Sequence, residues 1–524
     1  MRVLFEMFNL KLSNNRHLSK MKIKKSKFKQ GNIKLLLASS LMVFMAGCST
    51  KVAQFSDEER FNRATEDMAS MFAGQAPVTG PITLGEAIAR AISYNLDHRL
   101  KRMETALAVR QYDFEKTGML PRLVADAGYS RRSNDPGANS VDIDTGEETL
   151  ANSTSTERTN EFSDLIFTWN TLDFGLSYYT AKQSSNEVWI AEERRRKTVQ
   201  NISQDVIDAF WKAWMAQSLQ PKIDALLAES STALESSKSL VSRGVQDSAD
   251  ALALQSSILN TINSLVEMRE RVDLGKARLG ALLNIRPGTD FKVSPPSTMD
   301  VPSRLSDGVE EISQKALLNR PELREEDYRK RVTQLDVKKA ILKMFPQLTF
   351  STGYYRNENS FLVNNDWTEI GADLSWDLLG ILNANAEKRF HQAGVDVADA
   401  RRVALSLAVI TQVYLGVSRY ELARTRYASA SELYNIRTRL SRNDRSRGSR
   451  VSGIEELDSR AAALAAEMRR NLAFVETQAA FARVINSAGI DPVPADVQGS
   501  DLKTLSDAFN QRWSDIVKGA LITY

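Results

Sequence analysis

The chain contains two similar halves. The stretch from Ala91 to Asn134 aligns with Ala316 to Asn359 at a constant shift of 225 residues and without a gap. Farther along, the shift is 205 residues and pairs Gly175 with Gly380. The matched residues include prolines, glycines and aromatic residues that mark turns, strands and helices and carry no reactive chemistry. The sequence therefore predicts two copies of one structural unit, and the function has to follow from that architecture.

An export signal precedes the two halves. Six lysines between positions 22 and 34 form a basic head that leads into an apolar run from Leu35 to Ala46. This run is too short to cross a bilayer as a mature helix, which is typical of a cleaved signal peptide. Because the signal begins at Met21, both Met1 and Met21 stand as candidate start residues.

The signal ends in Met45-Ala46-Gly47-Cys48, which resembles the cleavage box of bacterial lipoproteins, where the cysteine sulfur takes a diacylglycerol. Cys48 is the only cysteine of the chain, so no disulfide can form within it. We expect a covalent lipid on Cys48 and no other cofactor, with a buried thiol as the alternative. By the same resemblance, Ser49 in place of an aspartate favours sorting to the outer membrane.

The composition excludes some classes of protein. Of 524 residues, 42% are apolar, and 69 basic against 65 acidic residues give a formal charge of +4. No basic face for nucleic acid is indicated. After Cys48 no stretch approaches 18 uninterrupted apolar residues, so we expect no transmembrane helix in the mature protein. Insertion into a membrane would have to come from strands.

Four short segments alternate between an apolar face and a small or polar face: residues 123–130, 164–169, 347–354 and 369–374. Aromatic residues lie near their ends. The pattern predicts four strands and suits both a membrane barrel, with lipid outside and water inside, and a soluble sandwich. Residues 135–161, between the first two strands, are polar and predict a solvated loop, which would be external on a membrane barrel.

Helical patterns fill most of the remaining chain. Thr83 with Glu86 three residues later fits a capping box, and one helix is expected from there to about Lys116, ended by Pro121.

After Gly175 and Gly380 the pattern stays helical to about Val241 and about Arg442, which predicts two helices of roughly 90 to 100 Å at 1.5 Å per residue. Turns follow, and the chain returns as two further helices. Apolar seams predict that these helices pack against others along their length. The seams are Val199, Ile202, Val206, Ala209 and Ala213; Val403, Leu407, Ile410, Tyr414 and Val417; and, in the returning helices, Leu252, Leu259, Val266, Leu457 and Leu464.

The four predicted strands and the apolar seams of the helices require an oligomer. A sheet in hydrocarbon has to close on itself, because an unpaired strand edge finds no hydrogen-bonding partner there. Small barrels need about eight strands, so four strands cannot close one. Several chains would therefore share one wall, and the apolar seams make the same demand because they would otherwise face water.

The ordered unit of helix, proline, strand, loop, strand, long helix, turn and returning helix resembles the TolC family of outer-membrane efflux and secretion channels. The resemblance rests jointly on the turns expected at Pro121 with Pro346 and at Gly175 with Gly380, and on the turn Arg243-Gly244-Val245. It implies a mixed, mainly α fold that forms a homotrimer. Four β-strands per chain would contribute to a shared twelve-stranded outer-membrane β-barrel, and long antiparallel α-helices would form a periplasmic α-barrel.

The resemblance also implies a function. The protein would be an exit duct of a tripartite efflux or type I secretion system in the outer membrane of a Gram-negative bacterium, lipid-anchored and extending into the periplasm. It would passively conduct substrate from a proton-driven or ATP-driven inner-membrane pump and a periplasmic adaptor protein. The alternative is a structural coiled-coil lipoprotein that tethers envelope layers, which leaves the four strands unexplained. The cargo stays open among drugs, metal ions and a secreted protein.

The patterns also divide the chain. The segments are an N-terminal extension with signal peptide at 1–47, a lipidated tether at 48–81 with a short helix, a first repeat at 82–285, a link at 286–308, a second repeat at 309–490, and a tail at 491–524 with one helix near Leu502 to Leu521.

Two acidic residues are candidates for a narrow mouth. Glu455 and Asp458 are three residues apart and so share one helix face just after the second turn. By the resemblance they match acidic residues that narrow the periplasmic end, where symmetry would gather copies into a negative ring that favours cations. An ordinary exposed helix start is the alternative, because acids favour the positive end of the helix dipole.

The two turns at the far tips are the expected contacts with the adaptor, with simple turns as the alternative. Their residues are Arg243, Gly244, Val245, Asp247 and Ser248 in the first tip, and Arg450, Val451, Ser452 and Gly453 in the second.

No catalytic centre is indicated. His17, His98 and His391 lack the spacing of metal ligands, and no phosphate-binding glycine loop or nucleophile elbow occurs. The acidic runs Glu192-Glu193 and Glu325-Glu326-Asp327 predict solvated helix faces rather than acid/base pairs. We therefore expect neither enzymatic activity nor a metal site.

Overall fold

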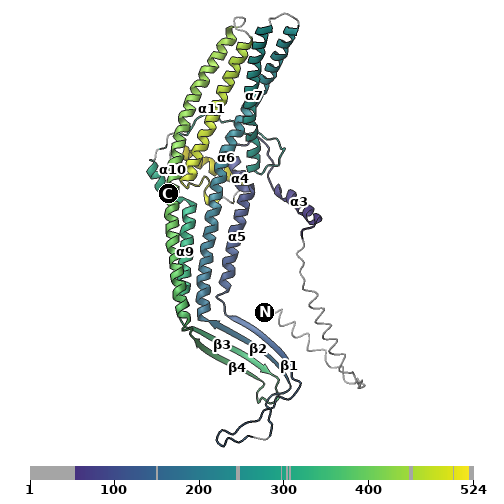
Figure 1. Ribbon diagram of the computed structural model, residues 1–524, viewed down its shortest axis with the longest axis vertical. Coiled ribbons are helices and arrows are strands. Elements are labelled where there is room, and N and C mark those ends of the chain that lie inside the picture. Colours follow the sequence, from purple (N-terminus) through teal and green to yellow (C-terminus); the bar gives the residue numbers. More distant parts are fainter. Residues whose placement is uncertain are drawn as a thin grey trace, which may run out of the picture. The chain divides into compact units, whose positions relative to one another are not determined.

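The computed structural model describes residues 54–518, except for 149–150, 243–247, 297, 303–304, 306–307, 448–452, 498 and 500. The chain divides into two units after Ser70. The helix expected in the tether is α3 (Asp57–Met71), which Ser56 caps by accepting a hydrogen bond from the backbone N–H of Glu59. Among the described residues, the strands and the other helices belong to the second unit (Figure 1).

The elements of the second unit occur in the same order twice. The first set is α4 (Leu84–Tyr94), α5 (Leu96–Thr117), β1 (Arg122–Arg131), β2 (Thr159–Asn170), α6 (Thr171–Ser242) and α7 (Ser248–Leu282). The second set is α8 (Val309–Asn319), α9 (Pro321–Leu342), β3 (Gln347–Asn357), β4 (Asp366–Ser375), α10 (Gly380–Arg447) and α11 (Gly453–Ser487), followed by η2 (Ala495–Val497) and α12 (Leu502–Val517). A shift of 225 residues carries the bounds of α4 and α5 onto α8 and α9, and a shift of 205 carries α7 onto α11.

The single helix expected from Thr83 to Lys116 is two helices. Asn95, with φ −63 and ψ 128, has extended backbone and separates α4 from α5, and its side-chain oxygen caps the first turn of α5. Arg320, 225 residues later, has almost the same backbone angles between α8 and α9. Periodicity does not reveal either break because helical residues continue directly on both sides. Thr83 does cap α4, through its Oγ1 and the backbone N–H of Glu86.

The prolines and glycines of the repeat have different roles. Pro121 and Pro346 each stand one residue before a strand. Gly380 begins α10 as expected, but Gly175 is not a turn, because α6 already begins at Thr171. A Cβ on Gly175 would lie 2.5 Å from Cδ2 of Leu342, so the glycine permits the end of α9 to approach α6.

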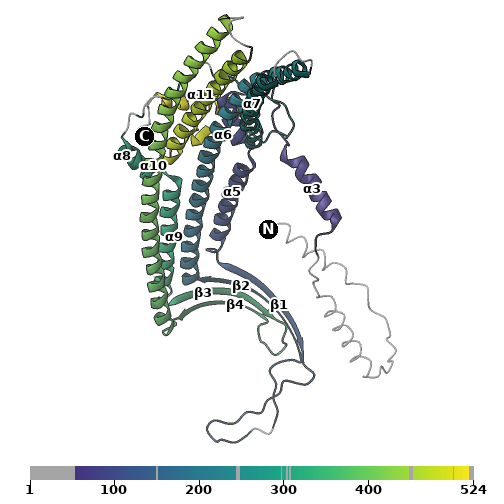
Figure 2. The same cartoon turned by 45° about the horizontal axis from the view of Figure 1, so that its top comes forward.

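The helices lie side by side in two sets that share α6 and α10. Toward the sheet the order is α5, α6, α9, α10, and away from the sheet it is α7, α6, α11, α10 (Figures 1 and 2). The main core forms around α6, where Trp211 and Trp214 pack edge-on against Phe474 of α11. The seam of Val199, Ile202 and Val206 is buried as expected, whereas Val403, Leu407 and Tyr414 of the second seam are exposed in the chain.

The four strands form one antiparallel sheet in the order β1-β2-β3-β4. The register places Leu123 opposite Phe167, Phe167 opposite Thr352, and Thr352 opposite Ile370. β1 and β4 are the edges. The helices meet the sheet at the ends of its strands, so its faces are not covered by them (Figure 1).

Candidate functional site

One face of the sheet is apolar and exposed. Side chains alternate between faces along a strand, so the row of Leu123, Phe167, Thr352 and Ile370 lies on a single face. Leu123 is 65% exposed and Ile370 is 85% exposed. Four further rows on this face contribute Ala125, Leu165 and Tyr354; Trp169 and Phe350; Leu348 and Leu374; and Tyr129. Toward the loops the face becomes polar, with Glu161, Ser163, Arg356 and Asp366. A soluble sheet buries such a face, whereas a membrane barrel turns it to lipid.

The apolar face has aromatic residues toward both ends. Trp169 stacks on Phe350 with 6.0 Å between ring centroids, and it also contacts Phe174 at the start of α6. Tyr354 and Tyr129 lie nearer the other strand ends. Aromatic girdles at both interfaces are typical of strands that cross a membrane.

The opposite face is mixed: it carries Val124, Ile166, Phe162 and Trp367 together with a set of acidic residues. Asp126 lies opposite Asp164, and Asp164 lies opposite Tyr355. The strands place four carboxylates on this face, from Asp126, Asp164, Glu369 and Asp373, against the one guanidinium of Arg122. If this face lines a water-filled bore, the bore carries a negative potential that attracts cations.

Both edges of the sheet are open within the chain. The outer side of β1 and the outer side of β4 have no strand partner among the described residues. Unpaired backbone groups in hydrocarbon cost several kcal/mol each, so a sheet exposed to lipid needs further strands at both edges.

The two expected mouth residues are placed differently. Glu455 is exposed in the first turn of α11. Asp458 is partly buried, and its two oxygens accept hydrogen bonds from Ser257 Oγ at 3.1 Å and Thr261 Oγ1 at 2.7 Å, both on α7. Sequence reasoning brought the two acids together on α11 but did not reveal these partners, which lie about two hundred residues away.

The tips and the lipidation residue lie mostly outside the described residues. This applies to Cys48, Arg243, Gly244, Val245, Asp247, Arg450, Val451 and Ser452. Ser248 begins α7 and Gly453 begins α11, so both tips are connections between antiparallel helices.

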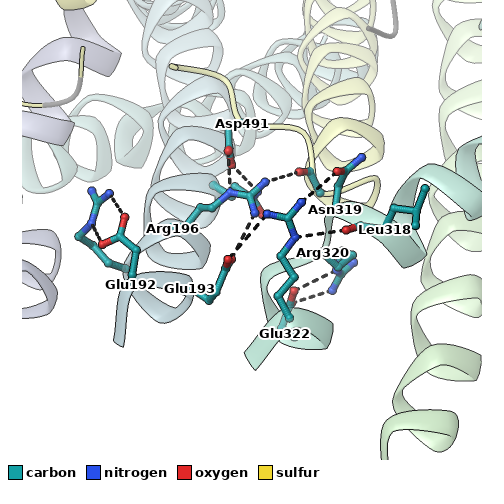
Figure 3. Close-up of polar contacts among 12 residues, drawn as sticks. Glu192, Glu193, Arg196, Leu318, Asn319, Arg320, Glu322 and Asp491 are labelled. Carbon is teal, nitrogen blue, oxygen red and sulfur yellow. Dashed lines mark hydrogen bonds and ion pairs between the residues drawn. The ribbon is translucent and has the colours of Figure 1, made fainter. Parts of the chain in front are cut away.

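A network of charges joins α6 to the break between α8 and α9 and to the end of α11 (Figure 3). Arg196 donates to Asp491 Oδ2 at 2.6 Å, to the carbonyl of Gly489 at 3.2 Å and to Glu193 at 3.2 Å. Arg324 also lies 3.8 Å from Glu193. The expectation that Glu193 faces solvent is therefore wrong, because its side chain is buried between two arginines.

The second acidic run is also paired. Glu325 accepts hydrogen bonds from Arg194 and Arg329, and Glu326 is buried. The spacing of Glu192 and Glu193 three residues before Arg195 and Arg196 was a visible signal for part of this network.

Burial acts on the pKa values of the network. Burial raises the pKa of Glu193, although the charges of Arg196 and Arg324 oppose this. Burial would also raise the pKa of Glu322, but the hydrogen bond from Arg320 and the charge of Lys197 outweigh it and lower that pKa. The network holds three segments of the chain together.

Comparison with known proteins supports the fold. No model of a protein family and no curated protein matches the sequence. Among solved structures, the outer-membrane channel OprN matches with a TM-score of 0.59 and 19% identity over 78% of this chain and 89% of that one. The open state of the Neisseria gonorrhoeae MtrE outer-membrane channel matches with a TM-score of 0.60 and 16% identity over 78% and 89%.

The Campylobacter jejuni CmeC outer-membrane channel matches with a TM-score of 0.61 and 13% identity over 88% of this chain and 97% of that one. These similarities cover 78% to 88% of this chain. The chain therefore has the fold of the TolC-family outer-membrane efflux channels.

Proposed function

We propose that the protein is the outer-membrane exit duct of a tripartite efflux or type I secretion system, through which substrate passes without energy input by the duct. The observation that carries this proposal is the sheet, which combines an exposed apolar face, a face with a set of acidic residues and two open edges. These three properties suit one wall segment of a water-filled membrane barrel. A soluble protein would leave all three uncompensated.

The proposed assembly is a homotrimer. Each chain supplies four strands, so three chains supply twelve, enough for a barrel with an aqueous bore. The number three comes from the resemblance to the channel family, and the open edges of the sheet support the need for more than one chain.

The proposed mouth of the duct lies at the ends of α7 and α11. Glu455 and Asp458 would form a negative ring there, and the tips containing Arg243 and Arg450 would contact a periplasmic adaptor protein, which delivers substrate from an inner-membrane pump. Reversal of charge at Arg243 and Arg450 should abolish export and leave assembly intact. Normal export by this double variant would contradict adaptor contact through the tips.

A diacylglycerol on Cys48 would anchor the chain in the outer membrane. The mass of the N-terminal peptide of the mature protein tests this directly. A Cys48→Ser variant should lack the added lipid mass, and an unmodified thiol in the wild type would contradict the proposal.

The experiment that decides between the two functions is a measurement of ion conductance. Protein extracted gently from outer membranes should migrate as a heat-resistant oligomer and should produce discrete ion conductance in planar lipid bilayers. A structural lipoprotein that tethers envelope layers would yield helical oligomers without conductance. A water-soluble monomer with no lipid-embedded sheet would contradict the duct outright.

A further inference from the structure

A basic cavity of about 260 Å³ lies between α6, α10 and α11, beside the break between α8 and α9. Four of the residues that line it are cationic: Lys197, Arg320, Arg419 and Arg483. The other residues of the described lining are polar or apolar, and none of them is acidic. Segments far apart in the sequence thus bring positive charges to one hollow and place no negative charge in its lining.

The buried part of the lining forms the floor of the cavity. Arg320 is 4% exposed and donates to both carboxylate oxygens of Glu322 (Figure 3). Lys197 Nζ lies 2.9 Å from Glu322 Oε1 and donates to Asn486 Oδ1 at 2.9 Å. One carboxylate is therefore shared by two cations, so the floor keeps one positive charge in excess.

The rim of the cavity carries two arginines without an acidic partner. Arg419 on α10 and Arg483 on α11 are exposed, and neither has a hydrogen bond or an ion pair with the part of the chain that the structure describes. Burial raises the pKa of Asp205 on α6, and Arg483 opposes this from beyond ion-pairing distance. Asp205 does not line the cavity. The rim therefore adds two positive charges to the one in excess at the floor.

The environment of Lys197 reflects this excess. Burial lowers the pKa of Lys197 although Glu322 opposes it, and the charge of Arg320 adds to the lowering. An ammonium group in such a place is incompletely compensated, because a buried charge needs a partner of its own. An anion in the cavity would supply that partner.

The cavity opens on a side of the helices that α8 and the segment after α11 do not cover. α8 receives a hydrogen bond from Tyr414 of α10, and the segment after α11 receives one from Arg196 of α6. Successive residues of a helix are about 100° apart, so Lys197 points about 100° away from Arg196, and Arg419 about 140° away from Tyr414. An extra layer fits more easily on the outside of a ring of helices, so the cavity belongs to the inner wall of the proposed duct.

The cavity lies near the middle of the long helices. At 1.5 Å per residue, Lys197 is roughly 40 Å along α6 from Thr171, where the sheet ends, and Arg483 is roughly 40 Å along α11 from Glu455. Salt at physiological ionic strength screens exposed charges over about 8 Å. The acidic residues of the sheet and of the proposed mouth therefore do not cancel the positive potential at the cavity.

We propose that this cavity is a binding subsite for the carboxylate or phosphate groups of a solute that passes through the duct. Arg419 and Arg483 hold the anionic group from the rim, because a guanidinium presents N–H donors that match the oxygens of carboxylates and phosphates. Lys197 adds charge from the floor. The inference rests on the proposed function, because it assigns a substrate class, solutes with acidic groups, to the proposed duct.

Block of the ion current by a multivalent anion tests the subsite. Citrate presents carboxylates and pyrophosphate presents phosphates, and each should reduce the single-channel current in planar bilayers. In an Arg419→Gln/Arg483→Gln variant the half-blocking concentration should rise at least about tenfold, because two charge-assisted contacts are lost. Both side chains are exposed and make no contact that the fold needs, so this variant should assemble like the wild type.

Arg426→Gln/Arg469→Gln is the matched control. Arg426 lies about two helical turns after Arg419 on α10, and Arg469 about four turns before Arg483 on α11. Both are exposed and neither lines the cavity. The control removes the same charge from the same two helices and should keep the block of the wild type. An equal loss of block in both variants would assign it to charge spread along the wall and overturn the subsite.

Thermal dissociation of the detergent-solubilised oligomer measures binding without conduction. A ligand that binds only the folded state stabilises it, so citrate should raise the dissociation temperature of the wild type and of the Arg426→Gln/Arg469→Gln control more than that of the Arg419→Gln/Arg483→Gln variant. The difference between variants is the readout, because a general salt effect would raise all three temperatures equally.

The outcomes separate the subsite from the proposed function. A conducting protein that shows no anion block, and in which citrate stabilises all variants equally, would overturn the subsite and leave the duct in place. A protein that does not conduct, but that citrate stabilises only when Arg419 and Arg483 are present, would support the cavity as an anion site and contradict the duct.

Discussion

Asp458 on α11 accepts a hydrogen bond from Thr261 on α7, with 2.7 Å between Oδ1 and Oγ1. The carboxylate at the proposed mouth is thus also a link between two helices of the same chain. Its charge and its hydrogen bond are separate properties, and different substitutions remove them.

Removal of the charge should weaken cation block. Glu455→Ala with Asp458→Ala should raise single-channel conductance and raise the half-blocking concentration of a trivalent cation about tenfold, because charges a few ångströms apart interact by roughly 1 kcal/mol each in water. Thr261→Val is the matched control, since it removes the hydrogen bond and keeps the carboxylate. Equal block of both variants and the wild type in planar bilayers would reject the negative ring.

Much of the fold could be predicted from the sequence, for a physical reason. The helical period repeats many times along α6 and α10, and the alternation in the four strands fixes their faces. Periodicity alone misses the breaks at Asn95 and Arg320, although two local signals were visible: asparagine is a favoured N-cap residue, and Pro321 stands at the start of α9. Gly175 was misplaced because a glycine that permits close packing looks the same in sequence as one that permits a turn.

Only those parts of the candidate site whose residues are close together in the sequence could be predicted. Glu455 and Asp458 are neighbours on one helix turn, so spacing alone groups them. The partners of Asp458 on α7 are 197 and 201 residues away, and Asp491 is 295 residues from Arg196. No local period encodes such contacts, and only the two shifts of the repeat indicate which distant elements meet.

Gly489→Ala should destabilise the protein. Gly489 has φ +73, and a Cβ there would lie 2.7 Å from the backbone nitrogen of Arg320. The positive φ alone costs about 1 to 3 kcal/mol for a residue with a side chain, and the contact with backbone adds to it. The expected result is a lower temperature of thermal dissociation of the detergent-solubilised oligomer.

Asn284 supplies the control for Gly489. It lies 205 residues earlier at the end of α7, with φ 55. Asn284→Gly keeps the backbone conformation and loses the 2.6 Å hydrogen bond to the carbonyl of Met71, so its effect should stay below about 1 kcal/mol. A larger effect from Asn284→Gly than from Gly489→Ala would show that crowding at Gly489 is not important.

Arg320→Met should lower the stability of the protein more than Gly489→Ala or Asn284→Gly. Arg320 is 4% exposed, donates to the carbonyl of Ser487 at 3.1 Å and to Gln412 at 2.9 Å, and pairs with Glu322 at 2.8 Å. Loss of one member of a buried ion pair costs about 3 to 5 kcal/mol. Glu322 is 26% exposed and keeps Lys197 as a partner at 2.9 Å in this variant, so we expect a loss toward the lower end of that range, measured by the same thermal dissociation.

His98 should make stability depend on pH. The ring is 1% exposed, with Nδ1 2.7 Å from the carbonyl of Ile92 and Nε2 3.4 Å from Nη1 of Arg195. Burial lowers the pKa of His98 below its ordinary value of 6.5, and the Ile92 carbonyl only partly opposes this. The folded protein therefore binds this proton less readily than the unfolded chain does. The contribution of His98 to stability is complete above about pH 6.5 and is lost as the pH falls through the lower folded pKa.

The dissociation temperature of the wild-type oligomer should thus fall between about pH 7.5 and about pH 5, and a His98→Gln variant should lose part of that slope. An unchanged slope in His98→Gln would assign the pH dependence to other groups. Because the comparison concerns slopes and not absolute temperatures, it stays informative even if His98→Gln lowers stability at every pH.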